Sequence, residues 1–448
     1  MEINQVNWKE IEEEATRYLS QYLQINTTNP PGDEIRGARF LKEVLDKEGI
    51  DNKIIESAPG RANLLAHFPG KGNGKPLLLL NHIDVVPVEE DKWSYSPFSG
   101  KVIGGEIWGR GALDCKSLGI IQTMVLILLK RMKGSLNRGV IMAATADEEK
   151  GGEWGVGWLC HNYPEFTRVE AVINEGGGVG IPRFGKNYYL CQVGEKGACW
   201  FRIVFPGTPG HGSLPREDNC LFSLGQFLAS LQNYQSRIHL TKIIEQLAEL
   251  FSEDKEIGPL LKEFLLDPNQ GEDVFKSISD GGIRQLLLAL TQNTFVPTVV
   301  KGGEKVNVIP SECFCEIDCR ILPGETITGV KKEISKILGN INQYTLVELQ
   351  TSIASESDFS HPLFSIFGEI LRRYDPQAVL VPYFSSGATD SRYFRKKNIP
   401  AFGFAPLLIE GELKNHQDMI HGHNERISQK NLVFGIKVLY EVVKRFCG

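Results

Sequence analysis

Three short apolar runs in the first half of the chain are each followed by side chains that can bind metals or transfer protons. The runs span residues 77–80, 139–145 and 169–174. Buried parallel strands have this pattern, and open α/β sheets bind ligands beyond the carboxyl ends of their strands. The side chains that follow the runs are His82 and Asp84, then Glu148 and Glu149, and then Glu175. We therefore expect these groups to meet at one edge of a sheet.

Two further side chains could complete a metal site. Asp114 stands in a glycine-rich turn just before an apolar helix, and a histidine near the end of the chain is available among His416, His421 and His423. Imidazole and carboxylate groups are ligands that zinc accepts, and five of them suit two ions about 3.5–4 Å apart that share one carboxylate. Asp114 is the predicted shared ligand, because a short carboxylate at this place can reach both ions.

Each of these residues taken alone has a simpler explanation. A histidine after a strand is usually only hydrogen-bonded, an aspartate can cap a helix, and glutamates in a first helical turn favour the helix dipole. Because potential metal ligands follow several successive strands, one shared metal site explains them better than separate structural roles. Residues two apart in a strand face the same way, so Asp84 is predicted to support His82. One carboxylate must stay off the metals as general base, and either Glu148 or Glu149 could serve.

Length and composition limit the class of protein. A chain of 448 residues exceeds one ordinary core, and its 42% apolar and 23% charged content is typical of globular proteins. The net charge of −6 gives no basic surface for nucleic acid, so a small or peptide-like ligand is expected.

The acidic amino terminus lacks a secretory signal pattern, and the longest apolar run, 118–129, is too short to span a membrane. We expect a cytoplasmic enzyme. The nine cysteines form no C-x-x-C pair, which favours free thiols.

The order of the predicted elements indicates an α/β domain interrupted by a smaller α+β domain. Asn7 is a plausible cap for the first helix. The predicted helices are 8–23, 34–47, 117–131, 222–231 and 327–338, one from 362 and one from 428, with a helical insertion over 236–290. The further predicted strands are 53–56, 63–68, 200–205, 313–322, 378–381 and one near 401. These elements give two parts of one domain, 1–195 and 353–448, on either side of an inserted domain, 196–352.

Motifs that contain the candidate residues resemble those of metallopeptidase family M20. In order along the chain they are NHIDVVPV, W-x-x-x-PFSG, GRGALDCK, DEEKGG, INEGG, GTPGHGS and HGHNER. The family includes aminoacylase-1, carboxypeptidases, and acetylornithine and succinyl-diaminopimelate deacylases. The resemblance implies a zinc-peptidase-like α/β/α catalytic domain with an inserted lid and dimerisation domain. It also implies a homodimer with two Zn²⁺ per subunit, for which Co²⁺ or Mn²⁺ could substitute.

The resemblance also implies a role for each residue that matches a family motif. One zinc would be held by His82, Asp114 and Glu175, and the other by Asp114, Glu149 and His421. Glu148 would be the general base, Asp84 would orient His82, and His211 would stabilise the oxyanion, often from a partner subunit. The implied substrate-binding residues are Asn307, Arg320, Gly387 and Arg392, although Arg320 could instead pair with a neighbouring acid. Cys115 departs from the family, because many members have an acid after the bridging aspartate, where the peptide bond is cis.

The implied reaction is hydrolysis of an amide bond in an N-acyl amino acid or a short peptide with a free carboxylate. The motif W-x-x-x-PFSG followed by GEIWGRGALDCK favours the aminoacylase and carboxypeptidase branch. A desuccinylase or deacetylase of the diaminopimelate and acetylornithine type, and a dipeptidase, remain alternatives. An inactive binding protein is disfavoured, because no candidate ligand or base is missing.

Overall fold

A computed structural model gives the architecture of the chain. It describes residues 6–183, 185–252, 254–268, 271–279, 281–385, 387–411 and 413–448. The chain forms two compact units: the first comprises 1–193, 357–383 and 389–448, and the second comprises 194–356 and 384–388. The boundaries predicted from the sequence follow residues 195 and 352.

The centre of the first unit is a mixed sheet built around strand β3 (Leu77–His82), whose six residues are all buried. β3 pairs in parallel with β6 (Val140–Thr145) on one side and β7 (Ala171–Asn174) on the other. The strands predicted from the three apolar runs are therefore confirmed. Because the three strands are parallel, their carboxyl ends lie at the same edge of the sheet.

The rest of the sheet extends from these three strands. On the β6 side, β2 (Arg61–Phe68) and β1 (Asp51–Ala58) follow in antiparallel pairing. On the β7 side, β18 (Ala401–Gly403) pairs in parallel with β7 and is followed by β9, β8 and β19. The bounds of these three are Lys186–Glu195, Val179–Arg183 and Leu407–Leu408. Strands β8 and β9 were not predicted.

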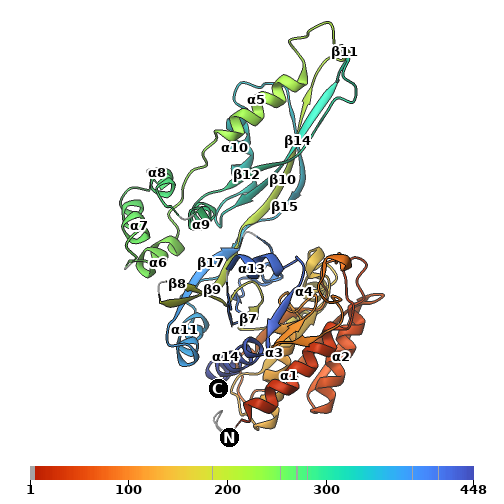
Figure 1. Ribbon diagram of the computed structural model, residues 1–448, viewed down its shortest axis with the longest axis vertical. Helices are drawn as coiled ribbons and strands as arrows, with labels where there is room; N and C mark the ends of the chain where they lie inside the picture. Colours follow the sequence, from red (N-terminus) through yellow and green to blue (C-terminus); the bar gives the residue numbers. More distant parts are fainter. Residues whose placement is uncertain are drawn as a thin grey trace. The chain divides into compact units, whose positions relative to one another are not determined.

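Helices cover the sheet of the first unit (Figure 1). They include α1 (Trp8–Leu23), α2 (Glu34–Lys47), α3 (Lys116–Arg131), α11 (Pro362–Tyr374) and α14 (Gln429–Cys447). Helix α3 is buried along almost its whole length, as expected of a helix that is apolar on every side, and it packs against α1 and α14. The predicted bounds of α1 and α2 are confirmed. Asn7 is the N-cap residue of α1, as predicted, and its carbonyl accepts the N–H of Ile11, although its side chain makes no capping bond.

The second unit is built on an antiparallel sheet with the strand order β12-β14-β10-β15. The bounds are Thr294–Gly302 for β12, Glu312–Ile321 for β14, Gly197–Pro206 for β10 and Thr345–Thr351 for β15. The buried side chains of β10 and β14 share one hydrophobic core with those of α5 (Cys220–Gln232) and α10 (Ile327–Leu338). The predicted α+β architecture is confirmed.

The insertion of the second unit is helical, as predicted. It contains α6 (Lys242–Leu250), α7 (Ile257–Leu266), α8 (Gly271–Lys276) and α9 (Gly281–Thr291). All nine cysteines of the chain are buried free thiols, which confirms the prediction from their spacing. In the described parts of both units, no helix has the length and apolar character needed to cross a membrane.

Candidate metal centre

The five predicted metal ligands, the predicted base Glu148 and Asp84 all belong to the first unit. His82 ends β3, Asp114 precedes α3, Glu148 and Glu149 open a short 3₁₀ helix after β6, and Glu175 follows β7. His421 follows helix α13 (Leu413–Met419). Ligand atoms within 4.8 Å of one another form three groups: His82–Glu148–Glu175, Asp114–Glu149–His421 and His82–Asp114–Cys115. The structure therefore gathers donors from five separate parts of the chain.

Asp114 belongs to two of these groups, His82–Asp114–Cys115 and Asp114–Glu149–His421. Its Oδ1 atom is 3.0 Å from Nε2 of His82, and its Oδ2 atom is 3.1 Å from Nε2 of His421. The same nitrogen of His421 is 3.2 Å from Oε2 of Glu149. The two oxygens of Asp114 thus face different histidines, which is the arrangement that a carboxylate shared by two ions requires.

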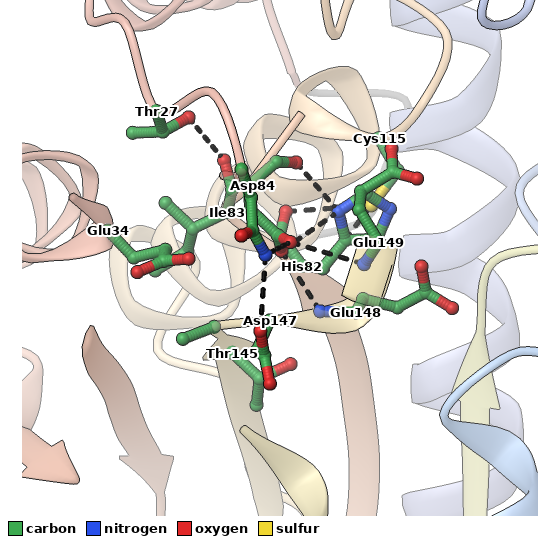
Figure 2. A network of polar contacts seen from close by, with 12 residues as sticks. Thr27, Glu34, His82, Ile83, Asp84, Cys115, Thr145, Asp147, Glu148 and Glu149 are labelled. Carbon is green, nitrogen blue, oxygen red and sulfur yellow. Dashed lines mark hydrogen bonds and ion pairs between the residues drawn. The ribbon is translucent and has the colours of Figure 1, made fainter. Parts of the chain in front are cut away.

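His82 is held by Asp84 through the backbone. Nδ1 of His82 is 2.9 Å from the carbonyl oxygen of Asp84, but 3.6 Å from its carboxylate. Donation from Nδ1 to that carbonyl leaves Nε2 free to act as a ligand. The Asp84 carboxylate instead accepts the backbone N–H groups of Glu148 and Glu149, each at 3.1 Å (Figure 2). Asp84 therefore contacts both the histidine and the turn that carries the two glutamates.

A buried glutamate that the sequence analysis did not single out holds the Asp114 turn. Glu425 accepts hydrogen bonds from Nη1 of Arg110 at 2.7 Å and from the backbone N–H groups of Gly111, Leu113 and Asp114 at 2.6–3.0 Å. The HGHNER motif contains this glutamate, so the motif was the available signal. In the same turn the Asp114–Cys115 peptide bond is cis.

Burial and mutual repulsion set the charge of the centre. Burial, together with the charge of Glu175, raises the pKa of Glu148 well above its usual value. Burial and the charge of Asp114 raise the pKa of Glu175 to about 8. Burial also opposes ionisation of Asp114, but hydrogen bonds from His421 and His82 lower the pKa of its carboxyl. The hydrogen bonds that His421 makes to Asp114 and Glu149 raise the pKa of its imidazole to about 10. Divalent cations would relieve this crowding of acids.

The donor set fits a pair of metal ions. Oε1 of Glu149 is buried and has no hydrogen-bond partner among the described residues. A buried carboxylate oxygen without a partner is costly, and a bound cation would satisfy it. Burial raises the pKa of the Cys115 thiol to about 12, so the remaining donors are imidazole and carboxylate groups, which suit zinc, manganese or cobalt.

A family model, "Peptidase family M20/M25/M40", matches residues 78–445. The chain belongs to this family. Its members are enzymes that act on amide bonds, and the chain is accordingly a metal-dependent M20 hydrolase. Aminoacylase-1 of Sus scrofa is 26% identical over 97% of this chain and 96% of its own length.

Solved structures of M20 proteins share the fold. An M20 family metallo-carboxypeptidase of Sulfolobus solfataricus has a TM-score of 0.71 at 21% identity, over 96% of this chain and 98% of that chain. A Bacillus subtilis protein described as a dinuclear metal-binding peptidase of the M20 family has a TM-score of 0.61 at 15% identity, over 98% and 99% of the two chains. These likenesses support the predicted architecture of a catalytic domain with an inserted domain.

Two histidines near His421 lie outside the three groups of the M20 centre. Nε2 of His423 is 2.9 Å from a carboxylate oxygen of the exposed Glu89. His416 lies on α13 and is half-buried, and burial lowers its pKa. Of the three histidines in this stretch, only His421 therefore contacts the candidate ligands.

Four of the remaining candidates belong to the second unit. His211, on strand β11 (Gly210–His211), is exposed, and its Nδ1 atom is 2.8 Å from Oγ of Ser213. Asn307 is exposed and close to this strand, because its carbonyl accepts the N–H of Gly212 at 2.9 Å. The structure thus brings His211 and Asn307 together.

The last three candidates have polar partners of their own. Nε and Nη2 of Arg320 donate to the two carboxylate oxygens of Asp318 at 2.8 and 2.9 Å. Arg320 thus pairs with a neighbouring acid, which was the alternative to substrate binding. The N–H of Gly387 donates to Oγ of Ser385 at 3.0 Å. Arg392 lies in the first unit, where its Nη2 donates at 2.6 Å to the carbonyl of Gly151 in the turn after Glu149.

Proposed function

We propose that this M20 enzyme hydrolyses the amide bond of N-acyl amino acids, or of short peptides with a free carboxylate, with two zinc ions. The observation that carries the proposal is the place of Asp114, whose two oxygens face different histidines in two overlapping groups of donors. The similarity to aminoacylase-1 over 97% of the chain supports the choice of N-acyl amino acids.

One proposed ligand set is the group Asp114–Glu149–His421, and the other joins Asp114 to two members of the group His82–Glu148–Glu175. His82, Asp114 and Glu175 would hold one ion, and Asp114, Glu149 and His421 the other. When bound, the two ions would act as Lewis acids toward the scissile carbonyl and make water a stronger acid. Co²⁺ and Mn²⁺ are proposed as functional substitutes, because both accept the same nitrogen and oxygen donors.

Glu148 is proposed as the general base. Its carboxyl is buried beside Glu175, and both effects raise its pKa, which favours uptake of a proton from water. The same carboxyl would then donate that proton to the leaving amine. Glu149 is the less suitable base, because its Oε2 atom already contacts His421 in the second group of donors.

The second unit would supply contacts to the substrate. His211 would donate to the oxyanion that forms on the attacked carbonyl, and Asn307 and Arg320 would bind the substrate carbonyl and carboxylate. Gly387 and Arg392 would line the same binding site. A homodimer is proposed as the active form, in which His211 could serve the partner subunit.

Hydrolysis of a substrate panel tests the proposal. N-acetyl amino acids, the corresponding N-acetyl amino acid amides and dipeptides would be offered to metal-stripped enzyme before and after addition of zinc, cobalt or manganese. We expect metal to restore cleavage of the N-acetyl amino acids, and the amides to be poor substrates because they lack the free carboxylate. Cleavage of dipeptides alone would make the chain a dipeptidase. Activity that persists after complete metal removal would refute the metal-dependent mechanism.

A further inference from the structure

Arg61, the first residue of β2, joins two acidic side chains of the first unit. Its Nε and Nη2 atoms lie 2.8 and 2.7 Å from the two carboxylate oxygens of Glu34. Nη2 also lies 2.8 Å from Oδ1 of Asp147. The side chains of Arg61, Glu34 and Asp147 are only 13%, 0% and 5% exposed. The planar guanidinium can serve both acids at once, which a single ammonium group cannot do with the same geometry.

Asp147 begins the turn that carries Glu148 and Glu149. Its φ of 71° lies in the left-handed region, which is uncommon for a residue other than glycine. Besides Arg61, Oδ1 accepts a bond from Nδ2 of Asn29 at 3.2 Å, and Oδ2 accepts the N–H of Trp154 at 3.0 Å. These bonds fix a backbone conformation that an aspartate seldom adopts unaided.

A second carboxylate, that of Asp84, also holds this turn, because it accepts the backbone N–H groups of Glu148 and Glu149. Asn29 connects Asp84 with Asp147, since its Nδ2 atom donates to Asp84 at 2.9 Å as well as to Asp147 at 3.2 Å. Glu148 and Glu149 are therefore placed by two carboxylates, and Arg61 is the cation that ion-pairs with one of them.

We propose that Arg61 is a positioning residue that places Glu148 and Glu149 by holding Asp147. The inference rests on the proposed function, because it takes Glu148 as the base and Glu149 as a metal ligand. Without the guanidinium, Glu34 and Asp147 would be buried without this cationic partner, and Asp147 would lose the charged donor that holds its Oδ1 atom in the turn. The turn would then relax and displace both glutamates from the donors that they face.

Turnover of Arg61→Ala and Arg61→Lys tests the proposal. We expect kcat for N-acyl amino acids to fall about 10–100-fold, the range for residues that orient metal ligands, with KM changed less than about threefold. A purely structural role would reduce the amount of folded enzyme without changing the kcat of the folded fraction. Millimolar guanidinium should restore part of the activity of Arg61→Ala, because it can bridge the two acids. Arg36→Ala, which removes an exposed arginine from α2, is the matched control.

A Co²⁺ titration of the metal-stripped protein gives a readout that needs no substrate. Arg61→Ala should weaken one of two Co²⁺ equivalents about 10–100-fold, because Glu149 would be displaced. If the wild-type enzyme cleaves no substrate in the panel, the proposed function fails, while the titration still tests Arg61. Folded Arg61→Ala and Arg61→Lys proteins with wild-type kcat and wild-type Co²⁺ affinity would overturn the inference.

Discussion

The two units differ in how their candidate functional side chains are held. In the first unit, His82 and Asp84 are buried and Glu149 is 6% exposed, and backbone N–H groups fix the turns that carry the donors. In the second unit, His211 and Asn307 are exposed on short strands or turns. The first unit thus assembles its site from its own residues, whereas in the second unit His211 and Asn307 are exposed and Arg320 pairs with the neighbouring Asp318.

This difference separates two tasks. Metal ligands must be preorganised to a fraction of an ångström, and three of the five proposed ligands, His82, Glu149 and Glu175, lie at the ends of strands β3, β6 and β7. Substrate contacts can be made by exposed groups that become ordered when substrate binds. Loss of a first-unit residue should therefore change metal content or the chemical step, and loss of a second-unit residue should change catalysis while the metals stay bound.

The largest effect is expected at Asp114. Asp114→Ala removes the carboxylate whose oxygens face both histidines, so at least one metal ion should be lost together with activity. Metal content measured by mass spectrometry on the purified variant checks this. Asp91→Ala, at an exposed position, is the control and should keep both ions. Two tightly bound ions in Asp114→Ala would end the dinuclear model and the contrast between the units.

Glu148→Gln should separate catalysis from metal binding within the first unit. The amide keeps the size of the side chain but cannot accept a proton, so kcat should fall about 10²–10⁴-fold with metal content unchanged. Steady-state kinetics and metal analysis on one preparation test this. Glu153→Gln, an exposed glutamate a few residues further on, should behave as wild type. Loss of metal in Glu148→Gln would make Glu148 a ligand, in line with its place beside His82 and Glu175.

The sequence was most informative where one element buries its whole surface. β3 was predicted from an uninterrupted apolar run and α1 and α2 from amphipathic patterns, because burial imposes these patterns locally. β12 escaped prediction because most of its residues are exposed, so no alternation marks a buried face. Arg61 escaped because its partner Asp147 is 86 residues away, and no local pattern records such a contact. Only the family motif pointed toward Glu425.

His211→Ala tests the second unit. Loss of an oxyanion donor should lower kcat about 10²–10³-fold, and metal content should not change because His211 belongs to the other unit. His239→Ala replaces another histidine of the second unit and is the control. If His211 acts in a partner subunit, mixed dimers of His211→Ala and Glu148→Gln should regain activity, since one of their two sites has both groups. Wild-type kcat in His211→Ala would exclude it from the mechanism.

The smallest expected effect concerns Lys196, a buried residue of the second unit. Its Nζ atom donates to the carbonyls of Ala289 and Gln292 at 3.0 and 2.7 Å. Burial, helped by the charge of Arg320, lowers its pKa to about 8. An unfolded lysine titrates near 10.4. Between these values the unfolded chain binds more protons than the folded one, so this residue makes stability rise with pH.

Lys196→Met should remove that contribution. The free energy of unfolding of the wild type, relative to the variant, should increase by about 1–3 kcal/mol between pH 8 and 10, because deprotonation of the buried lysine is completed in that interval. Thermal unfolding followed at several pH values measures the difference, and Lys262→Met, at an exposed position of the insertion, corrects for loss of a surface charge. A constant difference between wild type and Lys196→Met across this range would mean that Lys196 stays charged in the folded protein. The second unit would then hold a buried charge on carbonyl groups alone, and its interior would be more polar than its contacts indicate.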